Sequence, residues 1–309
     1  GPIVAGDPKG ELPALVGGVI GEDTLWACTT CGYCEAACPI ELEHLPKFYR
    51  MRQQRVLMEG AFPHELKPVF EAYEAQGNPW GLQAGERGDW AKGLDVPVVR
   101  SAADLADLDF LFYVGSAMSF DPRGQKIARA FVAILKQAGV RFGILGPREG
   151  STGECARRVG NEMLFQQLAA TLVGTLGEVG AKRIVTCDPH ALNSLRNEYP
   201  EFGGRYEVVH HTQLIDELVK SGRVQLSPTF ERVIYHEPCY LGRHNGEYEA
   251  PRAIVAVDRR AAMSLCPPQL PWLRKDEAEA LALLGKLKDI TANLRRDRIA
   301  EERSSAPPA

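Results

Sequence analysis

The chain has 309 residues, of which 45% are hydrophobic and 25% charged, and its formal net charge is −4. This composition predicts a globular protein of about two domains with a large buried core. The slightly acidic balance gives no electrostatic reason to expect nucleic-acid binding, and the longest apolar runs are too short to cross a bilayer.

After a Gly- and Pro-rich start, four cysteines fall within eleven positions: Cys28, Cys31, Cys34 and Cys38, with Pro39 after the last. The spacing C-x2-C-x2-C-x3-C-P is typical of bacterial ferredoxins, whose thiolates ligate a [4Fe–4S] cluster. We therefore predict one [4Fe–4S] cluster here, with a zinc site as the alternative. In modules with two clusters the fourth cysteine ligates the other cluster, so whether Cys38 closes this one stays open.

Helical periodicity follows the cysteines at residues 43–58 and 63–75. Residues 76–96 are rich in Gly, Trp and charge, and we expect a linker or a loop over the surface. The sequence thus predicts a small helical, ferredoxin-like domain over residues 1–92.

Four aromatic residues flank or follow the cysteines: Trp26, Tyr33, Trp80 and Trp90. We expect them to shield the cluster from water, which affects its potential. Recognition of a partner flavoprotein is an alternative use of Trp80 and Trp90.

From about residue 98, short apolar strands alternate with amphipathic helices. The predicted strands are 110–114, 141–145, 183–186, 206–209 and 232–235, and the predicted helices are 121–138, 161–176, 191–198 and 212–220. This alternation predicts an α/β fold with a mainly parallel sheet covered on both faces. We assign this α/β domain to residues 93–275, and an amphipathic helix with a disordered tail to 276–309. The helix at residues 121–138 is predicted to have one buried face, which contains Ile127, Phe131, Ile134, Leu135 and Ala138.

Several histidines lie at or just after the predicted strand ends: His190, His210, His211, His236 and His244. As a set they indicate a polar cleft at the carboxyl edge of the sheet; alternatively, each caps a helix or satisfies a backbone carbonyl. Arg243 and His244 could also bind an anion at a helix start. No Gly-rich phosphate loop or nucleophile elbow is present, so flavin or nicotinamide binding by this chain is not expected.

Sequence blocks over residues 20–255 resemble, in order, the iron–sulfur oxidoreductases related to heterodisulfide reductase, and most of all the branch associated with electron transfer flavoprotein. The blocks are residues 26–39, 78–82, 153–161, 197–204, 209–213 and 235–245. The resemblance fails after Arg252.

The resemblance implies a ferredoxin-like module followed by two cysteine-rich half-modules, each named for a Cys-Cys-Gly (CCG) signature and able to supply thiolates to a second metal centre. In the first half, the expected thiols fall on residues that are not cysteines: Ser116, Ser151, Asp188 and Ala191. Cys155 and Cys187 are displaced from the pattern, and we predict that both are ordinary small core residues.

The second half retains Cys239, while Cys266 is followed by two prolines and the closing cysteines are missing. A zinc or half-built site on Cys239, Cys266 and His236 is a weak alternative. The default expectation is that this domain holds no metal, and a second cluster is not expected.

The resemblance implies an iron–sulfur electron-transfer subunit that passes single electrons from a flavoprotein, such as electron transfer flavoprotein, toward a quinone or another acceptor in a larger complex. Two alternatives stay open: a thiol–disulfide reductase like heterodisulfide reductase, and a non-redox scaffold with a structural metal. Crowded thiols and the lack of a signal-peptide pattern predict a cytoplasmic protein, with peripheral attachment at the inner membrane face as an option. The transmembrane helices often found in the resembled branch are missing, which a separate membrane subunit or a truncation would explain.

Overall fold

The computed structural model describes residues 13–228, 234–257 and 262–264. The chain forms two compact units, the first made of Gly1–Ser227 with Pro238–Val257 and the second of Pro228–Glu237 with Asp258–Ala309. The helix expected after residue 276 lies outside the described residues, as does Cys266. The boundary between residues 92 and 93 stays a prediction.

A four-stranded parallel sheet is the centre of the first unit, with the strand order β2-β1-β3-β4. Its strands are β1 (Phe110–Tyr113), β2 (Phe142–Gly143), β3 (Arg183–Thr186) and β4 (Glu207–His210). All four lie within two residues of the predicted strands. The α/β prediction is therefore confirmed.

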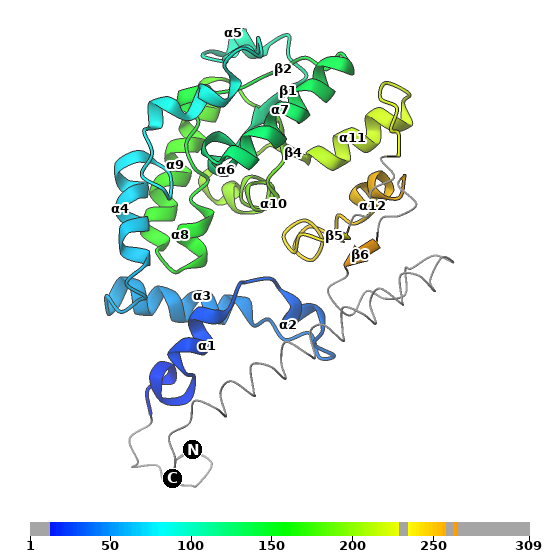
Figure 1. Ribbon diagram of the computed structural model, residues 1–309. Coiled ribbons are helices and arrows are strands. Elements are labelled where there is room, and N and C mark those ends of the chain that lie inside the picture. The colour runs from blue at the N-terminus through cyan, green and yellow to red at the C-terminus, as the bar shows by residue number, and fades with distance from the viewer. Residues whose placement is uncertain (1–12, 229–233, 258–261, 265–309) are drawn as a thin grey trace, which may run out of the picture. The chain divides into compact units, whose positions relative to one another are not determined.

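Helices cover both faces of this sheet (Figure 1). The longer helices after β1 are α7 (Pro122–Gln137), α9 (Glu162–Glu178) and α11 (His211–Lys220), and the shorter ones are α6 (Ser116–Phe120), α8 (Glu154–Arg158), α10 (Pro189–Asn193) and α12 (Glu249–Val255). Short helical segments complete the unit: η1 (Leu15–Val19), α5 (Ala102–Leu105), η4 (Gly146–Arg148), η5 (Ser194–Glu198) and η6 (Tyr199–Phe202).

Strand β1 is buried along its whole length because successive side chains serve two separate cores. Leu111 and Tyr113 belong to the core formed with α8 and α9. Phe110 and Phe112 belong to the core formed with α7 and α11. Such two-sided burial is typical of a parallel strand, and explains why this segment reads as a continuous apolar run.

The N-terminal helices are α1 (Glu22–Ala27), α2 (Tyr33–Ala36), α3 (Leu45–Gln53), which continues into η2 (Gln54–Met58), and α4 (Leu66–Gln76). Their positions confirm the helices predicted at 43–58 and 63–75. Val56, Phe70 and Tyr73 join the same core as helix α9. The helical segment is thereby packed onto one face of the α/β structure.

Two details of the prediction are wrong. Ile127 is 46% exposed, so it does not share the buried face of α7 with Phe131. The stretch 76–96 contains a 3₁₀ helix, η3 (Ala84–Ala91), in which Arg87 and Trp90 are buried. Trp90 packs edge-on against Phe112 and is a core residue rather than a shield for the cluster, whereas Trp80 is exposed.

The second unit contains strand β5 (Ile234–His236), paired in parallel with β6 (Ala262–Ser264). The segment predicted as a fifth strand of the main sheet therefore belongs to a separate two-stranded sheet. Within the described part of the chain, no helix is long and apolar enough to span a membrane.

Candidate functional site

The loop from Cys28 to Cys38, which we call the cysteine loop, carries the four predicted cluster ligands. Cys28 follows helix α1 directly, Cys34 lies in α2, and Cys38 comes just after that helix. Thr30 and Gly32 have φ angles of 56° and 73°. These left-handed residues coil the backbone tightly between the first and third cysteines.

Two of the sulfur atoms in this loop accept backbone hydrogen bonds. The Thr30 N–H donates to Cys28 Sγ, and the Leu42 N–H donates to Cys38 Sγ, both at 3.4 Å. Such N–H groups around thiolates tune the potential of iron–sulfur clusters.

The second thiol, Cys31, lies in an environment that favours the thiolate. Burial acts to raise its pKa, but hydrogen bonds from Tyr33 and Thr29 and the charge of Arg243 outweigh burial, so its pKa is lowered. Cluster assembly requires deprotonated cysteines. This local field therefore favours the thiolate form of Cys31.

Within the described residues, no three His, Cys, Asp or Glu side chains already converge on one metal-binding point. Cys34 is the exposed member of the four, and burial together with the charge of Glu35 raises its pKa. The donor set nevertheless fits an iron–sulfur cluster, since four soft thiols stand on one coiled loop and two of them already receive N–H bonds.

Arg52 anchors the start of the cysteine loop from helix α3. Its guanidinium is 3% exposed and donates to the carbonyl oxygens of Leu25 and Cys28, each at 2.6 Å, and of Arg158 at 2.8 Å. It also lies over the ring of Trp26. One buried cation thus joins α1, the loop and the end of α8, and it lies beside the first cysteine of the loop.

The middle of the loop is anchored by the turn at residues 238–246. Arg243 Nε donates to the Cys31 carbonyl oxygen at 2.7 Å, and His244 Nε2 lies 3.0 Å from the Thr30 carbonyl oxygen. A Cβ on Gly32 would come within 3.2 Å of His244 Nε2. In the described structure, Arg243 and His244 thus contact backbone carbonyl oxygens of the cysteine loop. The sequence had allowed a different role for them, the binding of an anion.

A ring stack extends from this turn to helix α10. Tyr240 stacks on His244 at 4.1 Å and on His190 at 3.9 Å between ring centroids. Its hydroxyl lies 2.7 Å from Thr30 Oγ1. The stack and its hydrogen bond explain why Tyr240 is fully buried.

Cys239 precedes this stack and is half-buried. Its pKa is raised by burial and by the nearby charge of Cys31, which places the two thiols in one electrostatic neighbourhood. His236 belongs to the second unit, and Cys266 is outside the described residues. The weak second metal site on these three residues stays a prediction.

A cavity of about 340 Å³ opens beside the cysteine loop, and we call it the cysteine-loop pocket. Cys155 lines it and is exposed, so the prediction that Cys155 is a core residue is wrong; Cys187, in contrast, is buried. The Cys155 thiol donates to Glu154 Oε1 at 2.8 Å. The surrounding protein atoms and the Glu154 carboxylate raise the pKa of Cys155, which favours its thiol form.

Glu154 and His190 form an ion pair on the wall of this pocket, with His190 Nδ1 3.1 Å from Glu154 Oε2. Burial acts to lower the pKa of His190, but the hydrogen bond and charge of Glu154 outweigh it, and the pKa is raised. This histidine is therefore neither a simple helix cap nor an isolated polar group.

At the carboxyl end of β1, where the resemblance implies a thiol, Ser116 accepts a hydrogen bond from Arg87 Nη1 at 3.1 Å. Arg87 also pairs with Glu149, and both side chains are fully buried. The Glu149 carboxylate accepts the N–H groups of Val114 and Gly115 at 2.8 Å each. An ion pair with its own hydrogen bonds thus occupies this end of the strand.

The other substituted positions are also engaged in local structure. Ser151 Oγ accepts the Gly153 N–H, and Asp188 Oδ1 accepts the His190 N–H as the cap of α10. Ala191 is buried in the core. None of these side chains offers the soft thiolate that an iron–sulfur cluster prefers as a ligand.

His210 is buried and His211 is partly buried, and their ring centroids lie 4.2 Å apart at the end of β4. Burial lowers the pKa of His210 to about 3 and that of His211 to about 4. His210 Nδ1 lies 2.7 Å from Thr212 Oγ1 and Nε2 lies 3.3 Å from the Cys187 carbonyl oxygen. His210 is thus a neutral, hydrogen-bonded core residue, as the alternative interpretation of the histidines predicts.

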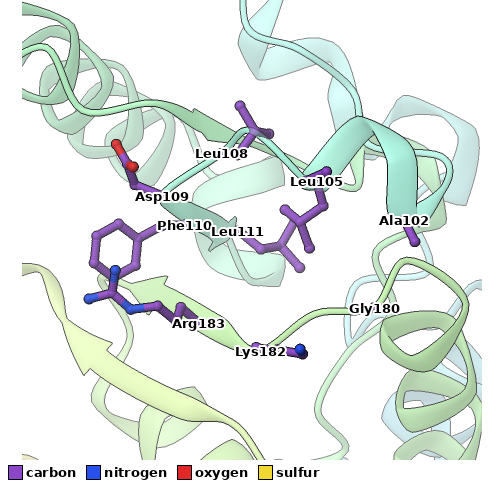
Figure 2. Close-up of a pocket in the computed structure, with 10 residues that line it drawn as sticks. Ala102, Leu105, Leu108, Asp109, Phe110, Leu111, Gly180, Lys182 and Arg183 are labelled. Carbon is purple, nitrogen blue, oxygen red and sulfur yellow. The ribbon is translucent and has the colours of Figure 1, made fainter.

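A second cavity of about 360 Å³ lies at the amino ends of β1 and β3 (Figure 2). Figure 2 shows the Arg183 side chain beside the ring of Phe110, with the guanidinium 4.3 Å from the ring centre. Arg183 also pairs with Glu207. Because sites in parallel sheets form at the carboxyl ends of strands, we do not regard this cavity as part of the functional site.

Sequence reasoning missed Arg52 and Tyr240. Arg52 could have been found, because it lies seven residues after Leu45 and four before Val56, on one stripe of a helix whose neighbours are buried. A charged residue in an apolar stripe predicts a buried, bonded group. Nothing in the local sequence marks Tyr240, since its partners are far away in the chain.

The fold and the thiol-bearing loop define a class of protein: an iron–sulfur-binding component joined to a cysteine-rich α/β domain. Residues 111–196 match the family described as "Cysteine-rich domain". The chain is a relative of iron–sulfur oxidoreductases and of heterodisulfide reductase components.

The chain is 44% identical over 248 residues to a "Probable iron-sulfur-binding oxidoreductase FadF" from Bacillus subtilis, a match that covers 79% of this chain and 35% of the relative. It is 39% identical over 248 residues to an "EtfAB:quinone oxidoreductase" from Syntrophomonas wolfei, covering 78% and 34%. The identity to one component of the dihydromethanophenazine:CoB--CoM heterodisulfide reductase from Methanosarcina barkeri is 26% over 245 residues, covering 76% and 57%. The chain thus spans between about a third and three fifths of these relatives' lengths. No solved structure matches.

Proposed function

We propose that the chain is an electron-transfer component that carries one [4Fe–4S] cluster on Cys28, Cys31, Cys34 and Cys38. Held by these thiolates, the cluster would supply one-electron transfer between a flavoprotein donor, such as electron transfer flavoprotein, and a quinone or another acceptor of a larger complex. Residues 1–92 are the helical domain that holds the cluster, and residues 93–275 the α/β domain that supports it.

One observation carries this proposal: the backbone of the cysteine loop is held by basic side chains. Three such groups, Arg52, Arg243 and His244, bind the carbonyl oxygens of Cys28, Cys31 and Thr30. The groups around a redox cluster should rearrange little when the charge of the cluster changes. A preorganised polar shell meets this requirement.

The protein's own residues have separate roles in this proposal. The four thiolates hold the cluster, which supplies one-electron chemistry when bound. The N–H groups of Thr30 and Leu42 stabilise negative charge on two sulfurs. The positive charge of Arg52 near the loop favours the reduced, more negative state of the cluster.

The experiment is anaerobic purification of the full chain, with iron and sulfide analysis and EPR spectra before and after reduction. We expect about four irons per chain and a reducible signal. One zinc without sulfide would support the non-redox scaffold instead. A second signal that a disulfide substrate perturbs would support the reductase.

The names of two relatives guide the choice of partners. One relative is called an EtfAB:quinone oxidoreductase and another is a component of a heterodisulfide reductase, and each name implies electron transfer with other proteins or carriers. We propose that this chain works at the cytoplasmic side, attached peripherally to a membrane partner. Co-purification of the tagged chain with electron transfer flavoprotein tests the donor.

A further inference from the structure

We infer that His190 takes up a proton at its Nε2 atom when the cluster on the cysteine loop gains an electron. This inference rests on the proposed function and adds a proton-binding residue to it. His190 lines the cysteine-loop pocket, and so does Cys28, the first predicted ligand of the cluster. A proton on this histidine would therefore offset part of the negative charge that reduction adds.

A single aromatic ring joins His190 to the cysteine loop. Its imidazole stacks on Tyr240 with 3.9 Å between ring centroids, and the Tyr240 hydroxyl lies 2.7 Å from Thr30 Oγ1. Thr30 in turn donates its N–H to Cys28 Sγ. Because Tyr240 is buried, little water screens charges along this line, and they interact more strongly than across solvent.

One nitrogen of the His190 ring is bound and the other is open. Nδ1 lies 3.1 Å from Glu154 Oε2, whereas Nε2 has no hydrogen-bond partner among the described residues. The side chain is 40% exposed, so water in the pocket has access to it. The Nδ1–H group can thus remain on Glu154 in both protonation states while Nε2 exchanges a proton with water.

Charged and titratable groups face His190 from helix α8, from the cap of α10 and from the turn at residues 238–246. They are Glu154, Cys155, Arg158, Asp188, Tyr240 and His244. Arg52 and Glu65 line the same pocket.

The balance among these groups favours a charge change of His190 near neutral pH. Burial and the charge of Arg158 act to lower the pKa of His190, but the hydrogen bond and charge of Glu154, together with Asp188, outweigh them, and the pKa is raised. Burial raises the pKa of Tyr240 and lowers that of His244, so both of these rings stay neutral near pH 7. His190 is therefore the ring of this stack that changes its charge, at a pH above about 6.5.

Electron and proton uptake are linked through the charge of the cluster. An added negative charge raises the pKa of a nearby histidine, so His190 has a higher pKa in the reduced protein than in the oxidised one. Between these two pKa values the flavoprotein donor supplies the electron and pocket water supplies the proton, and both leave again on reoxidation. In this pH window the reduction potential falls by up to about 59 mV for each tenfold fall in proton concentration. Below and above the window the potential does not change with pH.

The test is a redox titration of the full chain at a series of pH values, followed by EPR. We expect the potential of the parent to be constant at low pH and to fall as the pH rises above about 6.5. His190→Gln keeps a polar side chain but cannot titrate, so its potential should be the same throughout this range. His64→Gln is the matched control, since its side chain is 93% exposed, and should follow the parent.

Glu154→Gln separates proton binding from a structural role. Glutamine still accepts the bond from Nδ1–H but carries no charge, so the pKa of His190 should fall and the pH window should move to lower pH. NMR titration of the imidazole signals in the oxidised chain measures this pKa independently and should show a fall that equals the shift in the lower edge of the window. A potential that shifts equally at every pH would show a structural role and overturn the inference.

The outcomes distinguish this inference from the proposed function. If the cluster is reducible but His190→Gln keeps the slope of the parent, or Glu154→Gln leaves the window in place, His190 is not the proton acceptor while the electron carrier stands. If no reducible cluster forms at all, the proposed function itself fails, and this inference fails with it.

Discussion

Arg243 donates a hydrogen bond of 2.7 Å to the carbonyl oxygen of Cys31, although 212 residues separate the two in the sequence. The bond places a cation from the turn at residues 238–246 beside a predicted cluster ligand in the N-terminal helical segment. The charge of Arg243 also contributes to the lowered pKa of Cys31. In the proposed electron carrier, this contact would link the potential of the cluster to a distant part of the chain.

Replacement of Arg243 by Ala should lower the reduction potential of the cluster. The reduced cluster carries more negative charge, and loss of a nearby cation worth about 1 kcal/mol corresponds to roughly 40 mV for one electron. Redox titration followed by EPR measures the shift. Arg243→Lys, which keeps the charge, should restore much of it, and Arg205→Ala at an exposed position should have no effect. An unchanged potential in Arg243→Ala would contradict the electrostatic role.

Cys38→Ser and Cys239→Ser together decide which thiol completes the cluster. Cys38 stands on the cysteine loop with an N–H bond to its sulfur, whereas Cys239 lies on the turn at residues 238–246. We therefore expect Cys38→Ser to reduce the iron content below about four per chain and Cys239→Ser to retain it. Iron and sulfide analysis of anaerobically prepared variants gives the answer, with Cys155→Ser as the control. The reverse result would make Cys239 the fourth ligand.

Breaking the buried pair at the end of β1 should destabilise the fold strongly. Arg87→Met leaves the fully buried Glu149 without its cation, and loss of one partner of a buried pair costs about 3–5 kcal/mol. In the parent protein the charge of Arg87 opposes the rise that burial causes in the pKa of Glu149. In the variant that opposition is lost, so the pKa of Glu149 should rise further. Urea unfolding measures the loss. Arg183→Met, which breaks an exposed pair with Glu207, should cost less than about 1 kcal/mol; equal effects would refute the distinction.

His210→Gln should make stability less sensitive to acid. The folded protein holds the pKa of His210 at about 3, while the unfolded chain binds a proton near pH 6.5. The stability from neutral His210 is thus complete above about pH 6.5 and is lost as the pH falls, by about 1.4 kcal/mol per unit. When the pH is lowered from about 7 to about 5, the unfolding midpoint should fall less in the variant than in the parent.

His64→Gln is the matched control for this experiment. Its side chain is 93% exposed, so its replacement should leave the pH profile unchanged. A His210→Gln profile parallel to that of the parent would show that the buried imidazole does not carry the acid sensitivity.

The sequence predicted the sheet well because the strands are buried on both faces and appear as short apolar runs. Phe110–Tyr113 and Arg183–Thr186 are examples, found within a residue of the predicted bounds. The prediction failed where tertiary contacts outweigh local pattern. Trp90 lies in a Gly-rich stretch that resembles a surface loop, yet it packs in the core against Phe112.

The candidate site was predicted only as far as its ligands. Spacing and residue type mark the four cysteines, because a cluster needs several thiolates on one short segment. Their anchors could not be predicted in the same way. The contacts of Arg243, His244 and Tyr240 with the cysteine loop join residues more than 200 positions apart, and no periodicity encodes such a pairing.

This separation in sequence has a consequence for biosynthesis. The four cysteines and Arg52 are synthesised early. Arg243 and His244 follow only after some two hundred further residues have been added. Iron delivered to the nascent chain would therefore meet a loop secured at its start alone. The hydrogen bonds that hold the middle of the loop can form only once translation has passed residue 244.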